Sequence, residues 1–265
     1  MRSDEHNARG IELADRGWHD EAVKEFKKAI ELDPGSAHAH DNLATVYAEQ
    51  KKLREALAEY LTALRLDPEG ATAHFNLACF LATHAGALAV AEYRETLALE
   101  PGYPDAQLNL GLTLADQGET AAAREALGAA VAAAPGDAFA RSELAGLLMD
   151  EGDHRAAIAQ LKEATRLEPG NFEAWLDLGL CYAEKGFYDE AERAYGRAAL
   201  LAPDDLLVNY NLAALHALRG QGPAALATLR KALAADPAKV RGWLASDSMF
   251  DGLKGQPDFE TLVAG

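Results

Sequence analysis

Cysteine and positive charge are both scarce in this chain of 265 residues, and each shortage excludes a class of protein. Two cysteines, Cys79 and Cys181, cannot build a disulfide scaffold, so the composition is typical of a reducing compartment. Lys and Arg number 25 against 42 Asp and Glu, and the resulting net charge of -17 opposes binding to the phosphates of nucleic acids. No apolar run approaches the ~18 residues of a membrane span, and the polar opening has no signal-peptide core. We therefore expect a soluble, acidic, cytoplasmic protein with no nucleic-acid partner and no membrane insertion.

The local motifs of common enzymes are also missing. The sequence has no HExxH, no GxxxxGK[ST], no GxGxxG after a strand and no GxSxG. His6, His40 and His74 recur at one position of successive repeats, but no cysteine or carboxylate completes a convincing metal set. We predict no catalytic residue, no cofactor and no metal site, and a structural role for these histidines.

What the chain does have is an internal repeat marked by proline. Each proline closes a similar phrase, such as ELDPGS or RLEPGN, which predicts a helix that ends just before a turn. The prolines stand 33 or 34 residues apart, at Pro34, Pro68, Pro101, Pro135, Pro169, Pro203 and Pro237.

Seven units follow when this proline is placed at position 32 of a 34-residue repeat. Position 20 is then alanine in every unit, and position 8 is always Gly or Ala, which lets two helices approach closely. The predicted units are 3–36, 37–70, 71–103, 104–137, 138–171, 172–205 and 206–239, the third being one residue short.

The sixth unit carries the most complete pattern of the repeat. Its key residues are Trp175, Leu178, Gly179, Tyr182, Ala191, Tyr195, Ala198 and Pro203. This pattern resembles the tetratricopeptide repeat family across residues 3 to 239. The resemblance implies an all-α, right-handed α-α superhelical solenoid, in which the first helix (A) of each unit lines a concave groove and the second is helix B. It also implies a non-enzymatic scaffold or adaptor for protein–protein interaction.

Residues 240–265 depart from the repeat and are predicted to be capping helices. The last unit of a solenoid has an apolar face with no neighbour, so a terminal segment must cover it. The covering residues are predicted to be Trp243, Leu244, Met249, Phe250, Leu253, Phe259 and Leu262.

Positions 2, 5, 6, 9, 12 and 13 of each helix A are expected to face the groove, and their charge is one-sided. Of these 42 positions eleven are acidic and none is Lys or Arg, which favours a basic or amphipathic peptide partner. The acidic candidates for ligand contact are Asp41, Glu49, Asp105, Asp116, Glu143, Asp150, Asp177 and Glu184.

Position 6 is asparagine in four units, and an amide can both donate to and accept from a peptide backbone. The residues are Asn42, Asn76, Asn109 and Asn211, a run that resembles the asparagine ladder of O-linked sugar transferases. Phe75, Phe139 and Tyr210 are candidates for receiving apolar side chains of the ligand.

Three interpretations of function remain open at this point. The first is a peptide-binding scaffold that works through the groove. The second is an oligomerisation or complex-assembly module that self-associates through an uncapped N-terminal edge or the convex face. The third is the substrate-targeting region of a larger enzyme, which the asparagine run suggests.

Overall fold

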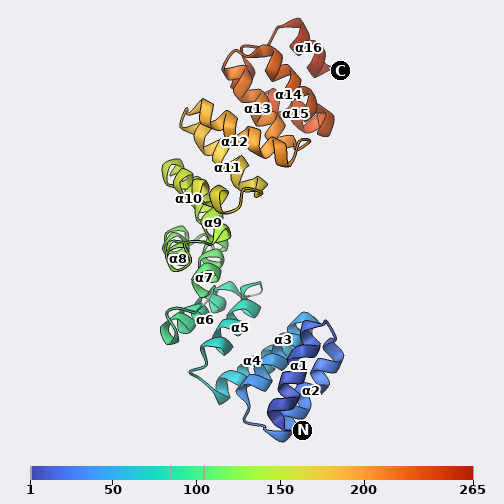
Figure 1. Cartoon of the computed structure of the whole chain (residues 1–265), viewed down its shortest axis with the longest axis vertical. Coiled ribbons are helices and arrows are strands. Elements are labelled where there is room, and N and C mark those ends of the chain that lie inside the picture. The colour runs from blue at the N-terminus through green and yellow to red at the C-terminus, as the bar shows by residue number, and fades with distance from the viewer. Residues whose placement is uncertain (1, 84, 104, 265) are drawn as a thin grey trace. The chain divides into compact units, whose positions relative to one another are not determined.

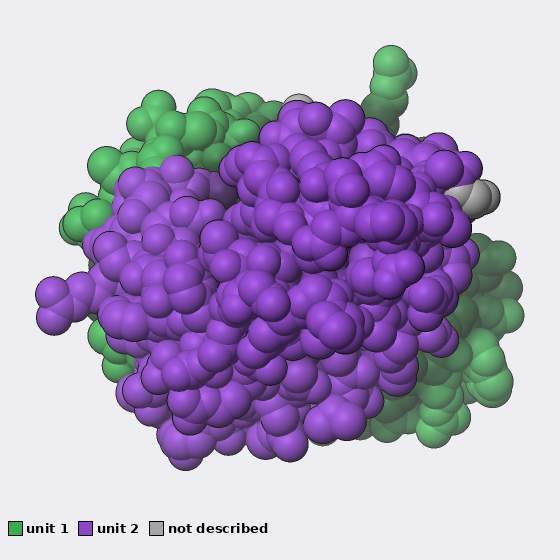
Figure 2. All heavy atoms as spheres, turned by 90° about the horizontal axis from the view of Figure 1, so that it is seen from above, with its two compact units in different colours: residues 1–133 green, residues 134–265 purple. Residues whose placement is uncertain are grey.

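The structure, a computed structural model, describes residues 2–83, 85–103 and 105–264. In these residues every regular element is helical, and the helices form antiparallel pairs that follow one another along the chain (Figure 1). The chain divides into two compact units, residues 1–133 and residues 134–265, which Figure 2 colours separately. His84 and Pro104, the predicted first residue of the fourth repeat, lie outside the described residues.

Unit 1 contains four helix hairpins, in which each helix A packs on the helix B that follows it. Its helices are α1 Ser3–Asp15, α2 His19–Leu32, α3 Ala37–Glu49, α4 Leu53–Leu66, α5 Ala71–Ala82, α6 Gly86–Leu99, α7 Ala106–Asp116 and α8 Thr120–Ala133.

Unit 2 contains three further hairpins and a C-terminal segment. Its hairpin helices are α9 Ala138–Asp150, α10 His154–Leu167, α11 Phe172–Glu184, α12 Tyr188–Leu201, α13 Leu206–Leu218 and α14 Gly222–Ala235. The segment comprises α15 Pro237–Leu244, the 3-10 helix η1 Ser248–Phe250 and α16 Pro257–Ala264.

Local signals in the sequence set the ends of these helices. Before several A helices a short polar side chain accepts a hydrogen bond from a backbone N–H of the first turn, as Ser36 does for α3 and Asp137 for α9. Helix B stops ahead of each repeat proline, which cannot continue a helix. Helix A ends with a left-handed residue that suits glycine, with φ of 71–77° at Gly17, Gly118, Gly152, Gly186 and Gly220. Lys51 takes the same position in the second repeat, with φ 59°.

The predicted small residues lie where helices meet. The alanines at position 20 are all 0% exposed, so each is fully enclosed between its neighbours. A Cβ added to Gly111, at position 8, would stand 2.7 Å from Cγ of the buried Leu127. Close approach of helix A to helix B therefore requires the small side chain.

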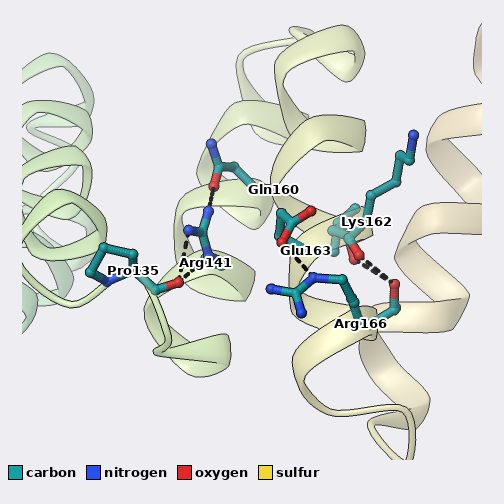
Figure 3. Close-up of polar contacts among 8 residues, drawn as sticks. Pro135, Arg141, Gln160, Lys162, Glu163 and Arg166 are labelled. Carbon is teal, nitrogen blue, oxygen red and sulfur yellow. Dashed lines mark hydrogen bonds and ion pairs between the residues drawn. The ribbon is translucent and has the colours of Figure 1, made fainter.

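In four repeats the side chain at position 4 of helix A donates a hydrogen bond to the turn that precedes that helix. Nε2 of His74 donates to the carbonyl oxygen of Pro68 at 3.1 Å, and Nε1 of Trp175 donates to that of Pro169 at 3.0 Å. Arg141 and Asn209 make the same contact to Pro135 and Pro203. Figure 3 shows Arg141 between Pro135 and Gln160 of the neighbouring helix.

The three histidines at position 4 each contact a glutamate on the B helix of their own repeat. In each pair Nδ1 lies 2.6 Å from the carboxylate, so the contact is structural, within one hairpin. The pairs are His6 with Glu25, His40 with Glu59 and His74 with Glu92. Among the described residues no group of three or more His, Cys, Asp or Glu is placed to hold a metal ion.

The C-terminal segment packs on the last hairpin. Phe250, Leu253 and Phe259 are at most 4% exposed and join a cluster with residues of α13 and α14. Met249 differs from its predicted covering role, because it is 40% exposed. Phe250, which follows Met249 in the same 3-10 helix, is the buried residue of η1.

Candidate functional site

The asparagines of unit 1 connect consecutive A helices. Nδ2 of Asn42 donates to Oδ1 of Asn7 on α1 at 3.1 Å, and Nδ2 of Asn76 donates to Oδ2 of Asp41 at 2.7 Å. Nδ2 of Asn109 lies 3.9 Å from Sγ of Cys79. One N–H of each amide thus serves contact between repeats, while an amide has a second N–H and a carbonyl oxygen for other partners.

Asp41 is the most unusual carboxylate of the predicted set. It is only 7% exposed, and its second oxygen, Oδ1, is buried with no hydrogen-bond partner. Burial raises the pKa of Asp41 to about 6, and the bond from Asn76 and the proximity of His38 only partly oppose this. A positive group placed near this carboxylate would relieve the cost of its burial.

Asp41 lines an acidic cavity of about 400 Å³ in unit 1. Three more carboxylates, Asp67, Glu69 and Glu100, line the same cavity, and none of the described lining residues is Lys or Arg. The remaining lining comes from the N-terminal turns of α3 and α5 and from the turns that precede helix A. Such a cavity attracts a cation and repels an anion.

The other predicted residues of unit 1 differ in exposure. Glu49, Asp105 and Asp116 are exposed, and Oε2 of Glu49 lies 3.0 Å from Nδ1 of His19. Phe75 is half-buried, with its ring centre 4.9 Å from that of Tyr103.

In unit 2 two predicted residues line one small cavity. Glu184 and Asn211 border a space of about 260 Å³ that is otherwise mostly apolar, with Leu218 and Met249 at its edge. Both of these apolar side chains are largely exposed, at 46% and 40%. A carboxylate and an amide beside apolar carbon suit a side chain that is itself amphipathic.

Asp177, also in unit 2, is half-buried, and its pKa is raised to about 6, first by burial and then by the nearby Glu173. Glu143 is half-buried, whereas Asp150 and Phe139 are exposed.

Tyr210 borders a space of about 370 Å³ together with Leu207 and Asn211 of α13, and it also packs under the C-terminal segment. It is 8% exposed, its hydroxyl donates to Oδ2 of Asp247 at 2.8 Å, and its ring packs on Trp243 and Phe250. The contact with Asp247 could not be predicted from the repeat pattern, because Asp247 lies beyond it.

Three carboxylates of the unit 1 cavity do not belong to the predicted set. Asp67, Glu69 and Glu100 lie outside helix A, next to the repeat prolines Pro68 and Pro101. A signal was present, since an acidic residue precedes five of the seven repeat prolines.

Comparison with known proteins identifies the repeat. The Tetratricopeptide repeat profile matches residues 86–138, 143–205 and 182–239, more than half of the chain. A second profile, described as TPR repeat, matches residues 10–51 and 44–79. The chain belongs to the tetratricopeptide repeat family.

Several solved tetratricopeptide repeat (TPR) structures are similar to this TPR protein. YrrB, described as a TPR protein with an unusual peptide-binding site, is 28% identical with a TM-score of 0.62, over 69% of this chain and 95% of that one. The C-terminal part of a TPR repeat-containing protein from Cytophaga hutchinsonii has a TM-score of 0.75 at 17% identity, over 93% and 99%. PilF of Pseudomonas aeruginosa has a TM-score of 0.68 at 24% identity, over 78% and 94%.

One curated protein shares a short segment with this TPR chain. Superkiller protein 3 of Schizosaccharomyces pombe is 43% identical over 61 residues, which are 23% of this chain and 4% of that protein. The chain therefore matches only a small part of this relative.

TPR proteins generally act as non-catalytic scaffolds for protein–protein interaction, and the fold supports that role here. The thiol of Cys181 is buried, and burial raises its pKa to about 12. None of the described helices of this TPR chain is long and apolar enough to cross a membrane.

Proposed function

We propose that the A-helix face of this protein binds a basic or amphipathic segment of a partner protein. The observation that carries the proposal is the acidic cavity of unit 1, where four carboxylates gather around a space of about 400 Å³. A lysine or arginine side chain of the partner would enter this cavity. In this proposal the electrostatic contact with the basic segment is made by unit 1.

Asp41 supplies the affinity for a cation in this proposal. Its buried charge is costly, so an ammonium or guanidinium bound nearby in the cavity would compensate a cost that the fold already bears. The exposed Glu69 and Glu100 would steer the approach of the basic segment, since exposed charges act mainly on association.

The asparagines supply contacts that do not depend on the ligand's side chains. Asn42, Asn76 and Asn109 occupy one position in successive repeats, and each retains amide groups beyond its contact to the preceding repeat. Those groups would bond the backbone of an extended peptide. The similarity to YrrB, whose description includes a peptide-binding site, supports this mode of binding.

A fluorescein-labelled peptide of alternating lysine and leucine would test the proposal by anisotropy. Raising the salt concentration from low to physiological should weaken binding, because contacts between exposed charges are screened. The double variant Glu69→Gln, Glu100→Gln should weaken it by about tenfold, since it removes two exposed attractive charges. Glu95→Gln, an exposed change on α6 that does not line the cavity, is the matched control.

The asparagines need a separate variant with its own stability check. Alanine at Asn42, Asn76 and Asn109 should weaken the same peptide, and thermal unfolding would show whether the lost contacts between repeats also destabilise the fold. Affinity that is insensitive to salt and equal in the glutamine variant would contradict an electrostatic site on this face.

A further inference from the structure

A second cavity, in unit 2, has the opposite character to the acidic one. It encloses about 540 Å³ and is bordered by α10 and α12, with residues of α11 between them. Trp175, Leu178 and Tyr182 of α11 form an apolar floor. The charged lining consists of Lys162, Arg166, Arg193, Arg197 and a single acid, Glu190. Four cations in one place are notable in a chain whose net charge is -17.

These cations are accessible and only weakly engaged. Nε of Arg166 lies 2.8 Å from the carboxylate of Glu163, one turn away on the same helix, as Figure 3 shows. Arg193 makes a longer contact of 3.6 Å to Glu190. The two arginine side chains are 66% and 75% exposed, and ion pairs that exposed contribute little, so a ligand carboxylate can replace them.

Arg197 lies where the charged lining of the cavity meets its apolar floor. Its guanidinium lies over the ring of Trp175, 5.6 Å from the ring centre. Because Nε1 of Trp175 donates to Pro169, the indole is held in place as a platform. A ligand that carries both an apolar side chain and carboxylates would meet matching groups at this point.

Another cavity of this protein, at equivalent positions of the repeat, can be compared with this one. Equivalent positions between the third and fourth repeats line a smaller space of about 240 Å³. There Glu125 stands in place of Arg193, Ala129 in place of Arg197 and Gln107 in place of Trp175. That lining contains one cation, Arg94, and one acid, so the basic aromatic character belongs to the junction of the fifth and sixth repeats and is not a general property of such junctions.

We infer that the cavity between α10 and α12 binds an acidic peptide segment of a partner protein, with an apolar anchor residue on Trp175, Leu178 and Tyr182. The cations favour a peptide because they lie on two helices, with two cations one turn apart on each, which suits carboxylates spaced along a chain. The charged residues of this site lie on the B helices α10 and α12, and its floor uses positions of α11 other than those predicted to face the groove, so the site is separate from the one proposed above. A scaffold with both sites would bind one basic and one acidic partner.

The test uses the full chain and a fluorescein-labelled peptide with a central phenylalanine flanked by glutamates. The variant Arg193→Glu, Arg197→Ala gives the cavity the residue types of the fourth repeat, which the same fold accommodates. We expect its affinity for the peptide to fall by about tenfold or more, because one attraction becomes a repulsion and a second is lost. The variant Arg230→Glu, Lys231→Ala, with exposed changes on α14 outside the cavity and the same change in net charge, is the control and should leave affinity nearly unchanged.

A second variant tests the anchor separately from the charge. Trp175→Gln copies Gln107 and retains an N–H donor for the carbonyl of Pro169, and it should weaken the phenylalanine peptide more than an all-glutamate peptide. A peptide with lysine in place of glutamate should not bind this cavity.

Three results would overturn the inference. The first is equal affinity of the acidic peptide for wild type and for the Arg193→Glu, Arg197→Ala variant. The second is full displacement of the peptide by inorganic pyrophosphate at similar concentration, which would indicate a site for small anions. The third is a concentration-dependent dimer, seen by light scattering, that this variant abolishes, which would make a second copy of the chain the occupant.

Discussion

The buried charge of Asp41 makes a specific prediction about stability. Its pKa in the folded protein is raised from 3.8 to about 6, and a shift of one unit corresponds to about 1.36 kcal/mol. Ionisation of Asp41 in the folded protein therefore lowers the free energy of unfolding by about 3 kcal/mol. Because the folded state binds the proton more tightly than the unfolded chain does, this cost is absent below about pH 4, grows as pH rises, and is complete above about pH 6.

Asp41→Asn should remove most of that cost. The free energy of unfolding near neutral pH should increase by about 1 to 3 kcal/mol, less than the full value because the amide brings N–H groups that need acceptors in a buried place. The same variant should bind the basic peptide more weakly, so stability and binding would change in opposite directions.

Urea unfolding followed by circular dichroism at several pH values would measure this. The difference between variant and wild type should shrink as pH falls from about 6 to about 4, because the wild-type carboxyl is then protonated in the folded protein. Asp116→Asn, at an exposed site, is the control and should stay within about 0.5 kcal/mol of wild type. A variant no more stable than wild type at neutral pH, with the same pH dependence, would refute the reasoning.

Further predictions concern packing and backbone conformation, each measured by thermal or urea unfolding. Gly179→Ala should destabilise by about 1 to 3 kcal/mol, since its new Cβ would collide with the buried ring of Tyr195, whereas Gly196→Ala, a helical site with nothing within 4 Å, should stabilise by about 0.5 to 1 kcal/mol. Equal effects of the two changes would contradict the packing argument. Lys51→Gly should stabilise by about 1 kcal/mol because Lys51 has a left-handed backbone, and a loss of stability there would show that its side chain matters more. Phe250→Ala should cost about 3 to 5 kcal/mol, and a cost below about 1 kcal/mol would mean that the C-terminal segment does not seal the last hairpin.

Most of the fold could be predicted because the repeat is a local pattern. Helices α3, α5, α9, α11 and α13 begin at the first residue of their predicted units, as α1 does at Ser3. Proline, glycine and alanine fix helix ends and close contacts through the backbone and through size, and these effects act within a few residues. Helix α7 starts at Ala106 instead of residue 104, after Asp105, whose φ is 61°.

The site could be predicted only in part, because periodicity gives the face of a helix but not what reaches it from elsewhere. It indicated that Asp41 and Asn76 lie on the same face, yet their hydrogen bond depends on how consecutive repeats pack. It gave no sign that Tyr210, on the predicted groove face, would also contact Asp247, which is 37 residues away in the chain. The basic cavity of unit 2 combines residues from three helices of two repeats, so no single motif announces it.

The contact of position 4 with the carbonyl of the preceding proline has a consequence for how such repeats diverge. Histidine, arginine, tryptophan and asparagine make it in four repeats, so the contact needs an N–H donor of sufficient reach and tolerates very different chemistry around that donor. One residue per repeat can thus be exchanged for a charged, aromatic or amide side chain while the joint between hairpins is kept. Trp175 illustrates the result, because Nε1 on one edge of its ring maintains the architecture while its face packs under Arg197 in the basic cavity.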